Sequence, residues 1–211
     1  TVVVSFLSIG DLDINGDAGT DSLSITDSID ITNGTFTAGT AGDINSISFD
    51  NTTGGSFATA GNVTLQAATT INSNDTGNDV TAALLTATAG TGIDLDTTVG
   101  TLDASVTGTG AIVIDETAAI VLQDIDTNEG SITITADGQI TATDVDSSNT
   151  DDDTNDISLT ATTGDILVTV VNAGSNNDVS LTSTAGAIVD NNGGANNICL
   201  LYTSPSPRDD R

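Results

Sequence analysis

Residues 155–166 read NDISLTATTGDI, and residues 177–188 repeat this phrase as NDVSLTSTAGAI. In both copies apolar side chains alternate with Thr, Ser or Asp, a glycine interrupts the run, and a second apolar stretch begins soon after it. Alternation with a period of two is typical of a strand with one buried face, and glycine is typical of a turn. The phrase therefore predicts a strand, a turn and a second strand.

Looser copies of the phrase lie earlier in the chain, at residues 132–140, 85–93 and 63–71. The second apolar position of each strand marks the spacing. These markers are Leu65, Leu85, Ile114, Ile134, Leu159 and Leu181. The step from the first to the second marker is about 20 residues, and the steps through the last four are about 20 to 25, a range typical of solenoid repeats.

Each repeat offers two or three short strands with one apolar face, which is too little to bury alone, so the repeats must stack. Stacked coils pair each strand with its counterparts in the neighbouring coils at about 4.8 Å. We therefore predict an all-β fold, a parallel β-helix or β-solenoid with coils of about 20–25 residues. A string of Ig-like sandwiches is the alternative, but residues 1–198 lack the Trp, Tyr and Cys typical of such cores.

The N-terminal quarter carries the same kind of pattern. We expect strands at residues 2–9, 23–25, 29–31 and 44–49, separated by turns rich in Gly, Thr, Asn and Asp. All four phenylalanines fall here, in apolar strand positions, and we interpret them as core residues rather than as a binding stripe. They are Phe6, Phe36, Phe49 and Phe57.

The composition allows disorder as an alternative, because a formal charge of −28 accompanies only 2% aromatic residues. The regular alternation of apolar residues favours an ordered chain instead. No stretch approaches the roughly 20 apolar residues of a membrane helix, so we expect no membrane insertion by this segment. The chain starts at Thr1 without a Met or a signal-like segment, and we expect it to be a piece of a longer protein.

The composition changes abruptly near the C-terminus. Residues 1–198 contain no Lys, Arg, His, Cys, Met, Trp, Tyr or Pro, whereas the stretch from residue 199 to the end contains Cys199, Tyr202, two prolines and two arginines. Residues 199–209, CLLYTSPSPRD, resemble a translated reading frame of a transposase-type sequencing adapter, residue for residue. We therefore predict a repeat segment over residues 1–198 and a non-native, adapter-derived tail over residues 199–211.

Residues 90–104, GTGIDLDTTVGTLDA, followed by GAIVIDE at 110–116, resemble the repeats of large bacterial surface proteins of the filamentous-haemagglutinin-like, β-strand-repeat type. The resemblance covers most of residues 63–188. It implies a secreted, right-handed β-helix that forms the shaft of an extracellular adhesin on the bacterial cell surface. Contact with a host, matrix or neighbouring-cell surface would then be made by other parts of the parent protein.

The missing residue types limit the chemistry. Without His, Cys or Lys, residues 1–198 lack the usual general base, thiol nucleophile and Schiff-base amine, and without cations they lack the groups that bind nucleic acid. We therefore predict a non-catalytic structural segment. A glycan- or matrix-binding β-helix module is the alternative, although few aromatics are available to stack on sugars. A polysaccharide hydrolase that uses two aspartates is a third.

Two acidic stretches are candidate calcium sites, and calcium is the only cofactor that the sequence suggests. The first is Asp11, Asp13, Asn15, Asp17 and Asp21, which opens like a D-x-D-x-N-G calcium loop but has Ser22 where the twelfth position needs Glu. The alternative is a strand with Leu12 and Ile14 pointing inward, followed by a turn rich in Asp and Asn.

The second candidate site is a long acidic loop. It contains Asp144, Asp146, Asp151, Asp152 and Asp153, with Asp156 at its end. Either the loop is a solvated insertion or these carboxylates hold a divalent cation weakly. Carboxylates stacked on successive coils repel one another by roughly 1 kcal/mol per pair, and residues 1–198 supply no cation to offset them. Bound calcium or salt must do so.

Overall fold

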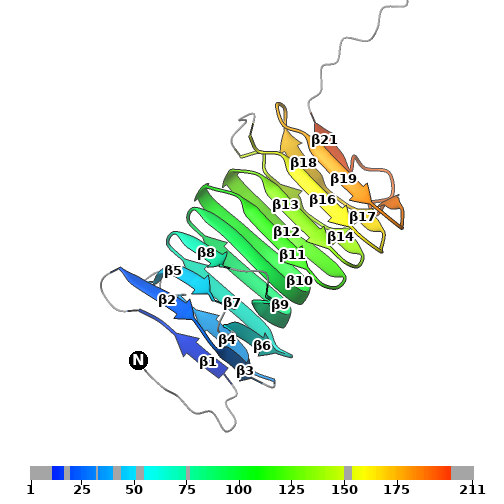
Figure 1. Ribbon diagram of the computed structural model, residues 1–211. Coiled ribbons are helices and arrows are strands. Elements are labelled where there is room, and N and C mark those ends of the chain that lie inside the picture. Colours follow the sequence, from blue (N-terminus) through cyan, green and yellow to red (C-terminus); the bar gives the residue numbers. More distant parts are fainter. Residues whose placement is uncertain are drawn as a thin grey trace, which may run out of the picture.

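The computed structural model describes residues 11–16, 20–31, 33–39, 44–50, 55–74, 77–149 and 154–200. All regular structure in these ranges is β-strand, and the strands stack one above another along a single axis (Figure 1). Every pairing between these strands in successive coils is parallel; examples are β4 with β7 and β13 with β16. The chain is therefore a β-solenoid, as the sequence predicts, and the alternative of Ig-like sandwiches is wrong.

The strands are short near both ends and longest in the middle of the chain. Their bounds are β1 (Asp11–Ile14), β2 (Asp21–Ile25), β3 (Ser28–Ile31), β4 (Thr35–Ala38), β5 (Ile44–Phe49), β6 (Ser56–Thr59), β7 (Asn62–Ala67), β8 (Thr70–Ser73), β9 (Val80–Ala89), β10 (Gly92–Thr109), β11 (Ile112–Glu116), β12 (Ile120–Glu129), β13 (Ile132–Ala136), β14 (Ile140–Ala142), β15 (Val145–Asp146), β16 (Ile157–Ala161), β17 (Ile166–Val168), β18 (Val171–Gly174), β19 (Val179–Ser183), β20 (Ile188–Asp190) and β21 (Ile198–Leu200).

One column of inward-facing residues measures the coils, because its members are register partners in successive coils. The column is Leu23, Ile47, Ile71, Ile93, Ile112, Ile132, Ile157 and Val179, and it passes through seven turns. The predicted coil length of about 20–25 residues is therefore confirmed. Only the step from Ile93 to Ile112 is slightly shorter than this range.

Three strands make one coil. Strands β5 and β6 lie between β4 and its partner β7, and β14 and β15 lie between β13 and its partner β16. In the middle of the chain a strand can continue across a corner of the coil. The long strand β10 is an example, because it pairs with β8, β9, β11 and β12. The sequence left open whether a repeat has two strands or three.

The register confirms most of the predicted repeat and corrects one part of it. Ile114, Ile134, Leu159 and Leu181 stack directly on one another. Leu65, however, stacks on Ala87, and Leu85 stacks on Val63. The equivalence of Leu65 with Leu85 is therefore wrong by two residues, a slip that keeps every side chain on the same face and so leaves the alternation unchanged.

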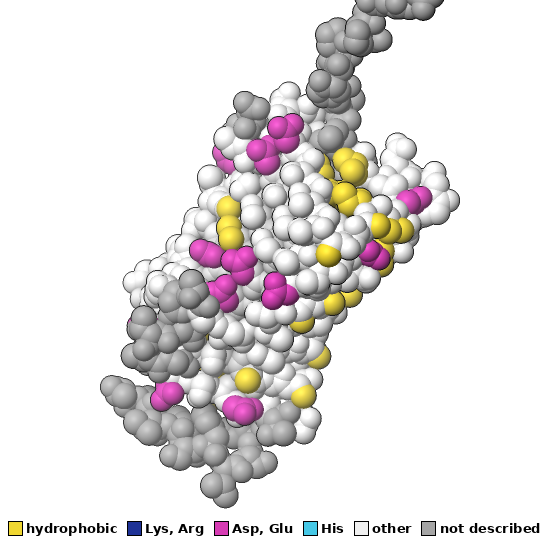
Figure 2. All heavy atoms as spheres, turned by 45° about the vertical axis from the view of Figure 1, so that its right-hand side comes forward, with side chains coloured by type: hydrophobic (Ala, Val, Ile, Leu, Met, Phe, Trp, Pro, Cys, Tyr) yellow, Lys and Arg dark blue, Asp and Glu magenta, His cyan; other side chains and the backbone are white. Residues whose placement is uncertain are grey.

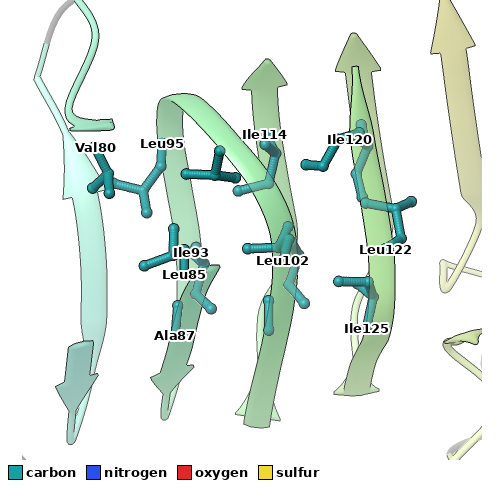
Figure 3. Packing of buried hydrophobic residues seen from close by; sticks show 14 of the residues in the cluster. Val80, Leu85, Ala87, Ile93, Leu95, Leu102, Ile114, Ile120, Leu122 and Ile125 are labelled. Carbon is teal, nitrogen blue, oxygen red and sulfur yellow. The ribbon is translucent and has the colours of Figure 1, made fainter. Parts of the chain in front are cut away.

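The core is one continuous column of inward-facing side chains. Figure 3 shows Ile93 and Leu102 of β10 and Ile114 of β11 in this interior, and each is at most 1% exposed. The coils nearer the N-terminus are filled by phenylalanine: the rings of Phe36 and Phe57 stack with centroids 3.6 Å apart, and Phe49 meets Phe57 edge-on at 5.5 Å. Three of the four predicted core phenylalanines are confirmed. Phe6 and the predicted strand at 2–9 lie outside the described residues.

The coil corners are held by side chains that bond to the backbone of a neighbouring coil. Asp11 Oδ1 accepts a hydrogen bond from Thr35 N at 2.9 Å, and Asp165 Oδ1 accepts one from Ala187 N at 2.8 Å. Because corners interrupt the ladder of backbone hydrogen bonds, a short acceptor at a corner satisfies an N–H group that would otherwise lack a protein partner. Some of the many Asp residues therefore have a structural role.

The glycine of the repeated phrase marks a close approach between coils. A Cβ on Gly138 would lie 2.6 Å from Ala119 N, and a Cβ on Gly164 would overlap Gln139 N. Only glycine allows the backbones to come this close without a shift. The turn predicted from the phrase is therefore also the place where adjacent coils touch.

Candidate functional site

The first predicted calcium site begins in a strand rather than in a loop. Asp11 and Asp13 point outward from β1, while Leu12 and Ile14 pack against the core. The backbone and hydroxyl of Thr35 donate to Asp11 Oδ1 at 2.9 and 2.6 Å, and these two hydrogen bonds lower the pKa of Asp11. Asp11 is thus engaged by the next coil.

The rest of this group surrounds the turn after β1. Asn15 Nδ2 donates to Asp13 Oδ1 at 3.1 Å, as in an Asx-rich turn. Asp21 begins β2 and helps to line an open hollow of about 360 Å³, together with Ile14, Asn15 and Leu23. The described part fits the alternative of an inward-facing strand and a turn. Asp17 lies outside the described residues, so calcium binding here stays a prediction.

The second predicted group is only partly described. Asp146 lies in β15, where Oδ1 accepts a hydrogen bond from Ser148 N at 2.6 Å and Oδ2 accepts one from Asn172 Nδ2 at 3.1 Å. Asp144 lies just before this strand and is exposed. Asp151, Asp152 and Asp153 lie outside the described ranges, so the loop as a whole is not tested.

The register places Asp144 and Asp146 beside acidic residues of other coils that the sequence analysis missed. Asp146 is the register partner of Asp126, and Asp124 is the register partner of Asp103. Partner residues on adjacent strands are about 4.8 Å apart. The resulting group, here called the carboxylate ladder, is Asp103, Asp124, Asp126, Asp144 and Asp146.

Burial, and then mutual repulsion, raise the pKa of several of these carboxylates. Partial burial is the largest cause that raises the pKa of Asp126 to about 6, followed by the negative charge of Asp124 and a hydrogen bond with it. The charges of Asp146 and Asp144 raise it further. Burial and then the Asp124 charge also raise the pKa of Asp103 and of Asp144. The ladder therefore favours proton or cation uptake.

A recurring spelling could have revealed this ladder. Asp124-Ile125-Asp126 returns one coil later as Asp144-Val145-Asp146. Two outward carboxylates flanking an inward apolar residue therefore stack on the same spelling in the next coil. The repeated Asp-apolar-Asp spelling is visible in the sequence, but only the register of β12 with β15 shows that its two copies stack.

A smaller acidic group of three residues lies on β10 and β11. Asp96 and Asp115 are register partners, and Asp94 lies two residues before Asp96 on the same strand. Partial burial, followed by the charge of Asp115, raises the pKa of Asp94. Crowding of carboxylates is thus a general feature of the central coils.

Two buried acids have structural partners instead. Glu116 is 3% exposed, and its Oε2 accepts hydrogen bonds from Thr97 Oγ1 at 2.9 Å and Val99 N at 2.8 Å. Burial raises the pKa of Glu116, and these hydrogen bonds oppose that shift. Asp79 is fully buried and accepts from Asp96 N at 2.8 Å. Both acids tie one coil to the next.

Among the described residues, no group of three or more acidic, His or Cys side chains is arranged to hold a metal ion. Figure 2 shows acidic side chains in separate groups over the surface, with no Lys or Arg on the described part of this face. The arrangement can attract cations along a surface, since uncompensated negative charge is spread over several coils.

Comparison with protein-family models, with curated proteins and with solved structures found no match. In the described ranges, no helix has the length and apolar character needed to cross a membrane.

Proposed function

We propose that this chain is part of the structural shaft of a secreted or cell-surface bacterial adhesin or exoprotein, and that it is non-catalytic. The observation that supports the proposal most is the unbroken stack of seven turns around one core. Such a stack lengthens by about 4.8 Å with each coil, so repeats add reach without adding a new fold. The shaft holds a binding region of the parent protein away from the cell.

The acidic surface is consistent with an exposed shaft. With a formal charge of −28 and no Lys or Arg before residue 208, neighbouring shafts repel one another side by side. The corners add carboxylates that also bond to the next coil, as Asp165 does with Ala187 N. Extracellular calcium or salt would screen the remaining repulsion along the carboxylate ladder.

Surface labelling of the source bacterium tests this proposal. Antibodies raised against the chain are expected to label intact cells. Labelling that appears only after the cells are made permeable would contradict a surface shaft. An internal cytoplasmic protein, labelled in parallel, controls for leaky cells.

A second function, direct binding of matrix or glycan by this segment, is favoured by the carboxylate ladder. Asp126 and its neighbours crowd negative charge on the outward face of β12 and β15, and a cationic partner would relieve it. A binding screen of the isolated chain against glycans and matrix proteins separates the two functions. A shaft is expected to bind none of them, whereas specific binding that Asp124→Asn and Asp126→Asn abolish would favour the binding module.

A further inference from the structure

One outward-facing row of the solenoid carries large apolar side chains. Its members are register partners in successive coils from β9 to β20, so they lie in a line along the axis at steps of about 4.8 Å. None of them is charged. This row, here called the apolar stripe, is Leu84, Thr101, Val121, Thr141, Leu167 and Val189.

The apolar stripe is open to solvent. Val121 is 37% exposed, Val189 is 39% exposed, and the two leucines of the stripe are partly exposed. An outward row on another side of the coils is polar instead, because it runs through Ser48, Asn72 and Asp94. Single exposed apolar side chains are ordinary on a protein surface, whereas a contiguous series of them marks an interaction surface.

The carboxylate ladder runs beside the apolar stripe on one side. Asp103 lies two residues after Thr101 on the outward face of β10, and its register partner is Asp124. Outward positions two residues apart on a strand are separated by about 6.7 Å. On the other side of the stripe, Ala83 and Gly100 are exposed and uncharged. The surface is therefore apolar along its centre and acidic along one side.

The spacing of the stripe fits a helix that lies along the axis. A helix with apolar residues at i, i+3, i+4 and i+7 presents one of them about every 5 Å, close to the coil spacing of about 4.8 Å. A strand laid along the axis would present one about every 6.7 Å and would fall out of step with the coils. A helix of about 16 residues covers the stripe from Leu84 to Val189.

We propose that the apolar stripe and the adjacent carboxylate ladder bind a basic amphipathic α-helix of a partner protein. The apolar face of the helix covers Val121 and Leu167, and Lys or Arg side chains on one side of that face lie against Asp103 and Asp124. The cations of the helix offset the repulsion between these carboxylates, which the chain itself leaves without a Lys or Arg before residue 208.

Charge disfavours a second copy of the chain as the occupant. A second copy would bring its own formal charge of −28 and its own row of carboxylates beside the stripe. A helical partner goes beyond the function of a shaft, because it would fasten a second protein along the length of the solenoid. Surface labelling of intact cells does not depend on that partner, so the two proposals can fail separately.

A synthetic peptide of Leu and Lys, about 18 residues long and with Leu at the helical spacing, is the probe. Its binding to the full chain is followed by fluorescence anisotropy. Val121→Thr combined with Leu167→Thr is expected to raise the dissociation constant about tenfold or more, because apolar contact area is lost. The matched control is Val113→Thr, on the outward face of β11 away from the stripe, and it is expected to change the dissociation constant less than about twofold.

A second variant tests the acidic side of the surface. Asp103→Asn combined with Asp124→Asn is expected to weaken binding and to make it less sensitive to salt, since fewer charge pairs remain to be screened. Circular dichroism of each variant shows whether the fold is kept. If the stripe variant unfolds, a parent-like affinity and salt dependence in the carboxylate variant would still overturn the proposal.

Four further results would overturn it. The first is no binding of the peptide to the parent chain, and the second is equal weakening by the stripe variant and by Val113→Thr. The third is equally tight binding of a scrambled peptide of the same composition, since charge alone would then explain the affinity. The fourth is self-association of the parent chain, in sedimentation, that the stripe variant abolishes, because that would assign the stripe to a second copy.

Discussion

Ile166 and Ile188 occupy the same position in successive coils, yet Ile166 is fully buried and Ile188 is 53% exposed. Val171 and Ile198 repeat the contrast at 0% and 41%. The interior strand β17 lies between β14 and β20, whereas β20 pairs with β17 alone among the described strands. A coil of this protein therefore does not bury its own apolar residues, because the coil above and the coil below bury them.

The largest expected effect comes from truncating the two isoleucines of this comparison. Ile166→Ala is expected to lower the free energy of unfolding by about 2–5 kcal/mol, because it leaves a cavity in a closed core. Ile188→Ala is expected to cost less than about 1 kcal/mol, since its side chain is already half in water. Urea unfolding followed by circular dichroism measures both. Equal losses of unfolding free energy in the two variants would contradict the conclusion that neighbouring coils bury Ile166 but not Ile188.

Contact between interior coils is also tested at a glycine. Gly138→Ala places a Cβ against the backbone of Ala119, and neither backbone can yield without moving its coil. A loss of about 1–3 kcal/mol is expected, as for other overpacked sites. Gly193 offers a control near the open end, where a Cβ would meet nothing within 4 Å. Because Gly193 has a φ of 68°, some backbone strain is expected there too, but no clash.

The carboxylate ladder predicts that interior coils lose stability as pH rises. The pKa of Asp126 is about 6 in the folded chain against an ordinary value of 3.8. A raised pKa in the folded state stabilises the protein fully below about pH 4, and this stabilisation is lost as pH rises through 6. Asp126→Asn is therefore expected to raise stability at neutral pH by about 1 kcal/mol, a figure reduced for solvent screening.

The matched control for this experiment is Asp30→Asn, which removes the same charge from β3, where its register partner is Ala58. Denaturant midpoints between pH 4 and pH 8 are the readout. A steeper pH dependence of stability in Asp126→Asn than in the parent chain would contradict the raised pKa of Asp126. An equal gain of stability in both variants would mean that the lower net charge alone explains the effect.

The smallest expected effect concerns calcium. Millimolar calcium is expected to raise the melting temperature of residues 1–198 more than sodium chloride of the same ionic strength, because a divalent ion neutralises neighbouring carboxylates together. Asp124→Asn combined with Asp146→Asn is expected to remove most of that difference. Equal shifts in the two salts would rule out specific calcium binding and leave only screening.

Much of the fold could be predicted from the sequence because strand alternation, turn glycines and the shortage of helix formers all agree. The stacking of Ile114, Ile134 and Leu159 followed directly from their spacing. The Leu65–Leu85 pairing failed because a two-residue slip preserves the inward and outward faces, so alternation cannot detect it. Only the positions of the corners fix that register.

The candidate site was harder to predict for the same reason. Asp144 and Asp146 were predicted from a run of acids along the chain, but their neighbours in space come from β12, one coil earlier, and from β10, two coils earlier. Asp11 was selected for a calcium loop, although Thr35 of the next coil donates two hydrogen bonds to it. Residues of successive coils can be matched as neighbours in space only when the length of each coil is known.

The most direct test of the shaft is to sequence the source DNA outward from the codons for Asn196 to Ile198. The open edge at Ile188 is expected to be covered by further coils, so the reading frame should continue into acidic repeats of about 19–25 residues. A reading frame that continues in this way would mean that residues 199–211 are adapter sequence, although strand β21 crosses the predicted boundary between residues 198 and 199. If the source DNA encodes Cys199 to Arg211 and then stops, the account of a longer repetitive shaft is contradicted at this end.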